Sequence, residues 1–228
     1  MPTESHSTAR LHLFHLVSPL LPIGMFAYSQ GLEAAITQKW VNHSSDAQDW
    51  IHGLLSRHLT QLDIPIIARL HSAFGDKNRE KVDYWNRYLY ASRETAELRA
   101  EDQALGLALA RLLRELAVPE AAQWYQHHKP VCYATLFTLA AVHWQLSLEE
   151  TAQAYLWSWL ENQVAAAVKL IPLGQSEGQR ILLAGLNHIP HCVSLGLQIT
   201  DDDIGQTSPA FSIASAWHET QYSRLFRS

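Results

Sequence analysis

The chain has 228 residues, of which 47% are hydrophobic, and a formal net charge of −5 at pH 7. This length suits one large domain or two small ones with a sizeable core. The acidic balance and the lack of a basic block argue against a nucleic-acid-binding protein.

The apolar residues of the first half recur with the three- and four-residue spacing of amphipathic helices. We expect a short helix that begins near His12 and is ended by Pro19. A capping box of Ser45 and Gln48 predicts the start of a longer helix, which Pro65 is expected to kink or interrupt. The predicted segments in chain order are an irregular link at 18–26, a helix at 29–40, an apolar stripe from Trp50 to Leu62, a turn at 75–78, and helices at 81–91 and 98–116.

The second half continues the helical pattern with helices at 130–144 and 147–171. The 147–171 helix starts at a capping box of Ser147 and Glu150. Pro172 ends it, Gly174 permits a left-handed exit, and Ser176 with Gln179 predicts the start of a helix that stops near Pro190. Ser208 before Pro209 predicts a last helix at 209–225.

No alternating strand pattern of useful length appears, so the sequence predicts an all-α, single-domain, multi-helix bundle spanning residues 1–228. No stretch approaches 18 uninterrupted apolar residues, and no transmembrane helix is expected. Cys132 and Cys192 have no CxxC spacing and suit a reducing compartment, so we expect a cytoplasmic protein.

Known catalytic and metal-binding motifs do not match this chain. The glycines of 174–180 have the wrong spacing for a phosphate-binding loop. His218-Glu219 is not HExxH, because Tyr222 takes the place of the second histidine. His188, His191 and Cys192 lie close together, but Pro190 breaks the helical geometry between them. We therefore expect no catalytic residue, no bound cofactor and no metal ligand.

Two charged features allow both a structural and a functional interpretation. The segment 91–106 can be a solvated helix face on which Arg93 meets Glu97, or a surface that faces a partner. Lys169 can cap the C-terminal end of its helix, where a cation interacts favourably with the helix dipole, or it can belong to a partner surface.

Four segments together resemble the UreF family of urease accessory proteins: LVSPLLPIGMFAYSQGL at 16–32, ASRETAELRAEDQALG at 91–106, WLENQVAAAVKLIPLGQSEGQR at 159–180 and IASAWHETQYSRLFRS at 213–228. The resemblance implies an all-α homodimeric scaffold without enzyme activity. It implies that the chain bridges UreD to the GTPase UreG, docks on the urease apoprotein and leaves nickel and GTP to its partners. Two alternatives stay open, namely a regulator that lends an arginine to the GTPase and a metallochaperone that binds nickel directly.

The resemblance also suggests two partner surfaces. The GTPase side is expected to contain Lys169, Pro172, Gly174, Gln175, Glu94 and Glu97. The UreD side is expected to contain Tyr28, Gln30, Tyr222, Arg224, Leu225, Phe226 and Arg227.

The two ends of the chain, 1–26 and 222–228, are expected to be flexible until a partner binds. The alternative for the C-terminal end is that Leu225 and Phe226 fold back on their own bundle. In the partner-bound interpretation, removing 222–228 leaves a folded helical protein that no longer binds UreD.

Overall fold

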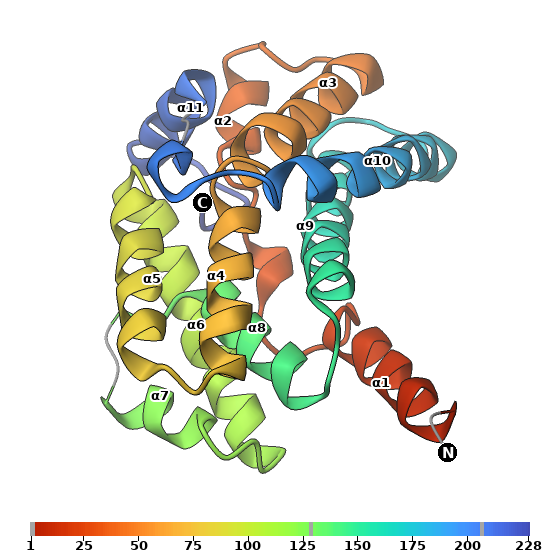
Figure 1. Ribbon diagram of the computed structural model, residues 1–228. Coiled ribbons are helices and arrows are strands. Elements are labelled where there is room, and N and C mark those ends of the chain that lie inside the picture. Colours follow the sequence, from red (N-terminus) through yellow and green to blue (C-terminus); the bar gives the residue numbers. More distant parts are fainter. Residues whose placement is uncertain (1–2, 128–129, 206–207) are drawn as a thin grey trace. The chain divides into compact units, whose positions relative to one another are not determined.

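The computed structural model describes residues 3–127, 130–205 and 208–228, and over these residues the regular structure is helical and contains no strand (Figure 1). The helices are α1 (Thr3–Leu16), α2 (Leu32–Thr37), α3 (Ser44–Leu54), α4 (Asp63–Gly75), α5 (Arg79–Ser92), α6 (Ala96–Glu115), α7 (Ala121–His127), α8 (Tyr133–His143), α9 (Leu148–Leu170), α10 (Gln175–Gly196) and α11 (Pro209–Glu219), with short helical turns η1 (Met25–Ala27), η2 (Leu55–Leu59) and η3 (Asp201–Asp203). The predicted all-α fold class is confirmed.

The contacts divide the chain into two compact units. Unit 1 consists of residues 1–24, 66–92 and 102–155, and unit 2 consists of residues 25–65, 93–101 and 156–228. The prediction of a single domain is not tested by this division, and each unit is described by itself.

Unit 1 is organised around the start of α8. The Asn86 side chain of α5 donates to the Pro130 carbonyl oxygen at 2.8 Å and accepts from the Cys132 amide at 3.1 Å. Asp102 of α6 accepts a 2.7 Å hydrogen bond from the Tyr133 amide, one of the donors that a helix start leaves without an intrahelical partner. A Cβ on Gly106 would lie 2.1 Å from the Val131 carbonyl oxygen, so glycine is required for α6 to approach this backbone.

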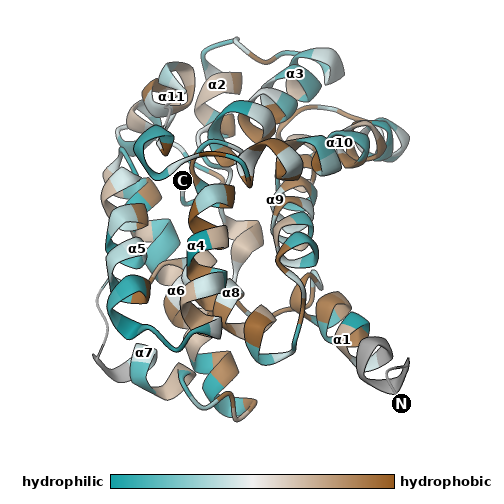
Figure 2. Cartoon of the chain, in the orientation of Figure 1, coloured by the Kyte–Doolittle hydropathy of each residue, from teal (hydrophilic) through white to brown (hydrophobic). Residues whose placement is uncertain are grey.

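Helices of unit 2 pack closely together, with glycines at the contacts of α11 with α2 and of α10 with α9. α11 packs on α2, where a Cβ on Gly31 would lie 3.1 Å from the Ser215 amide nitrogen. α10 packs on α3, and both helices carry hydrophilic and hydrophobic stretches, as expected for amphipathic helices (Figure 2). Gly178 brings α10 close to α9, because a Cβ there would lie 2.8 Å from a Val168 methyl group.

The sequence predictions of helix starts have mixed outcomes. The capping box before α9 is confirmed, since the Glu150 amide donates to Ser147 Oγ at 3.2 Å and the Glu150 carboxylate accepts from the Ser147 amide at 2.9 Å. The box predicted for α3 is wrong: that helix begins at Ser44, and Asp46 accepts from the His43 amide. The interruption predicted near Pro65 is present: η2 ends at Leu59, and Pro65 lies in the first turn of the next helix, α4, where its missing N–H is not needed.

The corner after α9 and the two last helices also differ from the predictions. Gly174 has φ −67° and ψ 150°, so it is extended rather than left-handed, and Glu177 accepts from its amide at 3.1 Å. α10 begins at Gln175 and continues through Pro190 to Gly196. Because Pro190 has no N–H, the carbonyl oxygen of Leu186 loses its helical hydrogen-bond partner. Both residues are exposed, so water can hydrogen-bond to that carbonyl. α11 ends at Glu219, six residues before the predicted end.

Candidate functional site

The candidate site lies in unit 2, where residues 222–228, here called the tail, meet α2, α6 and α9. We call the four residues Ser29, Glu33, Glu97 and Glu101 the tail socket. They come from the link before α2, from α2 itself and from α6. The tail follows α11 and ends at the letter C in Figure 1.

Glu33 is the central residue of the tail socket. It is 7% exposed, and its two carboxylate oxygens accept hydrogen bonds from consecutive tail amides, Leu225 at 2.7 Å and Phe226 at 2.8 Å. An ionised carboxylate is a strong acceptor for such amides, and this contact satisfies a buried charge that would otherwise be costly. The sequence analysis did not select Glu33; the available signal is a lone carboxylate in the otherwise apolar run Leu32 to Ile36.

The end of the tail is held by two further residues of the socket. The carbonyl oxygen of Ser228 accepts from the Ser29 amide at 2.7 Å and from the Ser29 hydroxyl at 2.6 Å. The Ser228 hydroxyl donates to Glu101 at 2.6 Å, and Ser228 is 1% exposed. The side chains of Tyr222 and Leu225, in contrast, are exposed. The tail therefore has an inner side fixed to unit 2 and an outer side that faces solvent.

Of the predicted UreD-side residues, Tyr28 and Gln30 lie inside unit 2. Tyr28 is buried, and its carbonyl oxygen accepts from the Asn162 side chain at 3.1 Å. Gln30 adopts a left-handed conformation with φ 53°, and its side chain donates to Glu101 and accepts from the Trp159 indole, both at 2.6 Å. These two residues therefore lie inside unit 2 beneath the tail and do not belong to the exposed side of the tail.

The structure brings the predicted GTPase side into contact with the tail. The Lys169 ammonium lies 5.6 Å from the centre of the Phe226 ring, within the range of a cation–π interaction. Glu97 accepts from the Arg224 guanidinium at 2.5 Å. Glu94 accepts a hydrogen bond from Ser212 of α11. Pro172, Gly174 and Gln175 are exposed at the corner between α9 and α10. The two predicted surfaces are therefore linked through Lys169, Glu97 and the tail.

The charged segment before and within α6 is not a solvated face. Arg93 is paired with Asp63 through two hydrogen bonds of 3.1 and 2.7 Å, and the Asp63 side chain is 0% exposed. Glu97 is paired with Arg224 and His218 instead of Arg93. Glu101 and Asp102 are buried. The solvated-face interpretation is thus wrong, because tertiary partners replaced the local pairs that sequence spacing suggested.

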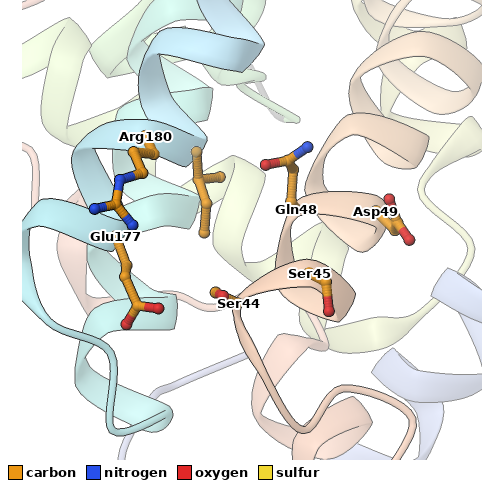
Figure 3. A pocket seen from close by; sticks show the side chains of 7 residues that line it. Ser44, Ser45, Gln48, Asp49, Glu177 and Arg180 are labelled. Atoms are coloured by element: carbon orange, nitrogen blue, oxygen red, sulfur yellow. The ribbon is translucent and has the colours of Figure 1, made fainter.

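A separate polar cavity of about 260 Å³ lies between the first turns of α3 and α10. Figure 3 shows Arg180 and Glu177 of α10 on one side and Ser44 and Gln48 of α3 on the other. The lining residues include two carboxylates, Asp49 and Glu177, and one arginine, Arg180, so the cavity combines both charges and does not define one ligand class.

Several histidine rings lie against other rings. The rings of His52 and His188 have centres 5.1 Å apart, and His12 stacks on Trp144 with ring centres 4.8 Å apart. Among the residues that the structure describes, no group of three or more His, Cys, Asp or Glu side chains is placed to hold a metal ion. Burial lowers the pKa of His58 to about 4, so this histidine is neutral near pH 7.

Comparison with known proteins identifies the class of this chain. The model of the UreF family matches residues 41–185. The UreF urease accessory protein of Alkalilimnicola ehrlichii is 47% identical over 100% of both chains, and that of Hahella chejuensis is 46% identical over 96% of this chain and 98% of its own. The corresponding protein of Teredinibacter turnerae is 45% identical over the same shares.

An all-helical chain with this match over its full length is a urease accessory protein. It belongs to the UreF family. In the described part of the chain, no helix combines the length and the apolar character that crossing a membrane requires.

Proposed function

We propose that this chain is a non-enzymatic, cytoplasmic, homodimeric scaffold that bridges UreD and the GTPase UreG while nickel is inserted into the urease apoprotein. In this proposal GTP and nickel are held by the partners, and the chain contributes differential binding to the nucleotide states of the GTPase. The full-length relationship to UreF urease accessory proteins is the observation that carries the proposal.

The outer side of the tail supports a partner surface. Tyr222 is fully exposed, with a relative exposure of 105%, and Leu225 is 65% exposed. Aromatic and aliphatic side chains in such positions are typical anchors of protein interfaces. Since the inner side of the tail is fixed by backbone hydrogen bonds to Glu33, these anchors are presented without the entropy cost of ordering a free segment.

The UreD contact is tested by exchanging exposed tail side chains rather than removing the tail. We expect Tyr222→Ala and Leu225→Ala to weaken co-purification with UreD at least tenfold while leaving thermal unfolding unchanged, since neither side chain is buried. Tyr84→Ala is a matched control, because Tyr84 is a 54% exposed tyrosine on α5, outside the tail. Undiminished UreD binding by both tail variants would contradict the proposed surface.

The GTPase contact is tested at Lys169. We expect Lys169→Ala to impair urease activation in a reconstituted mixture and to reduce the free energy of unfolding by no more than about 1 kcal/mol, as for an exposed cation–π contact or helix cap. Lys169→Arg keeps the charge and serves as the matched control. A loss above about 2 kcal/mol with normal activation would assign Lys169 a structural role instead.

The bridging scaffold, the arginine-lending regulator and the nickel-binding metallochaperone give different experimental results. Weighing the complexes of this chain, UreD and UreG with and without GTP and nickel tests the bridge. If the chain lends an arginine to the GTPase, adding the chain would accelerate GTP hydrolysis, and substitution of that one arginine would abolish the acceleration. Direct nickel transport would give tight one-to-one calorimetric binding to the isolated chain, lost on His188→Ala or His191→Ala.

A further inference from the structure

Two arginines of unit 1 lie against one tyrosine ring. Arg111 and Arg114 are three residues apart on α6, so their side chains leave the helix on neighbouring parts of one face. We call them the arginine pair. The guanidinium carbon of Arg114 lies 4.5 Å from the centre of the Tyr125 ring of α7, and that of Arg111 lies 5.7 Å from it, both within the range of cation–π interactions. Arg111 also donates to the Tyr125 hydroxyl at 3.5 Å.

A short turn between α6 and α7 brings the tyrosine to the arginine pair (Figure 1). Ala117 adopts a left-handed conformation with φ 60°, and its amide donates to the Arg114 carbonyl oxygen at 3.1 Å, so the chain reverses directly after α6. Val118 and Trp124, which precede Tyr125 in this segment, are 2% and 4% exposed. Their burial fixes α7 within unit 1, and Tyr125 is therefore positioned by packing that does not depend on the arginine pair.

The arginine pair has donors left for a ligand. Both side chains are exposed, and in the described part of the chain no carboxylate lies within ion-pair distance of either guanidinium group. A guanidinium group carries five N–H donors in its plane, so a ring against its face leaves donors at the edge of the plane available. The pair is thus available to an external anion, although the chain as a whole has a formal net charge of −5.

Beyond the bridging role proposed above, we propose that the arginine pair and Tyr125 form a docking site for an acidic peptide segment of a protein partner. Each guanidinium group donates two hydrogen bonds to one carboxylate of the segment, the bidentate geometry that arginine favours. The Tyr125 ring holds the two guanidinium groups in place before the segment arrives. Less side-chain entropy is then lost on binding than for two arginines that move freely in solvent.

The surroundings of the arginine pair favour a peptide over a nucleic acid. Glu115 and Glu120 are exposed at the same turn, so a strand of closely spaced phosphates would meet negative as well as positive charge. Leu116 is 45% exposed at this turn, and apolar side chains accompany charged ones in protein interfaces. The site therefore suits a peptide in which acidic and apolar side chains are mixed.

The site is tested on the isolated full chain, without UreD or UreG, so that its failure is separate from failure of the bridging role. The probe is a fluorescein-labelled peptide of sequence Glu-Glu-Leu-Glu-Glu-Leu, and fluorescence anisotropy measures its binding. We expect saturable binding at about 10 mM salt that weakens at about 150 mM salt, because the screening length falls from about 30 Å to about 8 Å. The matched peptide Gln-Gln-Leu-Gln-Gln-Leu is expected not to bind.

Variants assign the binding to the site. The double variant Arg111→Gln, Arg114→Gln removes both positive charges and is expected to weaken peptide binding about tenfold or more. Tyr125→Leu keeps both charges but removes the ring, and it is expected to weaken binding several-fold. Arg87→Gln is the matched control and should leave binding unchanged. Arg87 is an exposed arginine of α5 in unit 1, and its Nε donates to the Asp83 carbonyl oxygen at 3.2 Å.

Circular dichroism checks that each variant is folded. If the double glutamine variant does not fold, the double variant Arg111→Lys, Arg114→Lys decides, because it keeps both charges and loses the planar fork, and it must bind more weakly than the parent protein. Absent binding of the acidic peptide, equal binding of the glutamine peptide, or unchanged binding by the deciding double variant would overturn the site. Tighter binding of an oligothymidylate of the same charge would assign the arginine pair to phosphates and would equally overturn the proposal.

Discussion

At the scale of single residues, the most consequential charges in unit 2 are buried ones. Asp63, Glu33 and Glu101 are each exposed by 7% or less, and each contacts a group distant in sequence. Sequence spacing could suggest an ion pair of Arg93 with Glu97, because residues four apart share one face of a helix. It could not suggest the pair of Arg93 with Asp63, which is 30 residues away. The pair joins the first residue of α4 to the link that precedes α6, two segments of unit 2 that are distant in sequence.

We expect Asp63→Asn to be strongly destabilising. It leaves the Arg93 guanidinium, which is 11% exposed, without its bidentate charged partner, and breaking a buried pair on one side typically costs about 3–5 kcal/mol. Urea unfolding followed by circular dichroism measures the loss. Asp46→Asn, which removes an exposed histidine–carboxylate pair and weakens the cap of α3, is the control and should lower the unfolding midpoint much less. Equal midpoints for the two variants would contradict the importance of burial.

His58 predicts an acid-sensitive stability. Burial lowers the pKa of His58 to about 4, below the unfolded value near 6.5. The unfolded state therefore binds the proton first, and the contribution of His58 is complete above about pH 6.5 and is lost as the pH falls towards about 4. We expect His58→Leu to reduce the fall in unfolding free energy over this interval by up to about 3 kcal/mol. Parallel pH profiles of parent and variant in denaturant titrations would reject this assignment.

At the scale of helices, local capping signals had mixed outcomes: the boxes predicted at Ser45 and Ser176 are wrong, and the box predicted at Ser147 is confirmed. Ser147 and Glu150 form the capping box that their spacing predicts. The predicted end of α11 was wrong. The apolar spacing of Ile213, Trp217 and Leu225 is that of a helix, but the backbone amide of Leu225 donates to Glu33 instead of continuing the helix. The continuation of α10 through Pro190 was also missed, since packing of both halves of α10 on α3 and η2 outweighs the preference of proline to end a helix.

Close helix packing gives a matched pair of glycine substitutions. We expect Gly106→Ala to destabilise unit 1 by about 1–3 kcal/mol or more, because its Cβ would lie 2.1 Å from the Val131 carbonyl oxygen, a backbone atom that cannot rotate away. Gly53→Ala on α3 meets nothing within 4 Å and should be neutral or stabilising by up to about 1 kcal/mol. Thermal unfolding of both variants measures this difference, and equal melting temperatures would be inconsistent with it.

At the scale of the whole molecule, the sequence was sufficient for the fold class and the family, but not for the site. Helical periodicity and four sequence segments defined an all-α member of the UreF family. Of the predicted partner residues, Tyr28 is buried and Lys169 touches the tail, and neither position follows from spacing along the chain. Contacts between residues far apart in sequence depend on tertiary packing, which periodicity does not encode.

The apolar exposed residues predict self-association. Trp40 and Trp217 have ring centres 4.9 Å apart and are each about two-fifths exposed, and Leu183 and Leu186 are exposed on α10. Large apolar groups on a surface commonly mark an interface. We expect light scattering at micromolar concentration to give twice the mass of 25.8 kDa. A strictly monomeric mass at that concentration would count against the homodimer.

The contact between Ser29 and Ser228 has a consequence for synthesis of the chain on the ribosome. The two residues are separated by 199 positions. At about 5–20 residues per second, Ser29 and Glu33 leave the translation machinery roughly 10–40 s before the tail that completes their hydrogen bonds. During that interval α2 exists without its final partners, so unit 2 can acquire its native polar network only after translation has passed Ser228. Nascent chains stalled before the tail should therefore be more sensitive to protease within α2 than released chains.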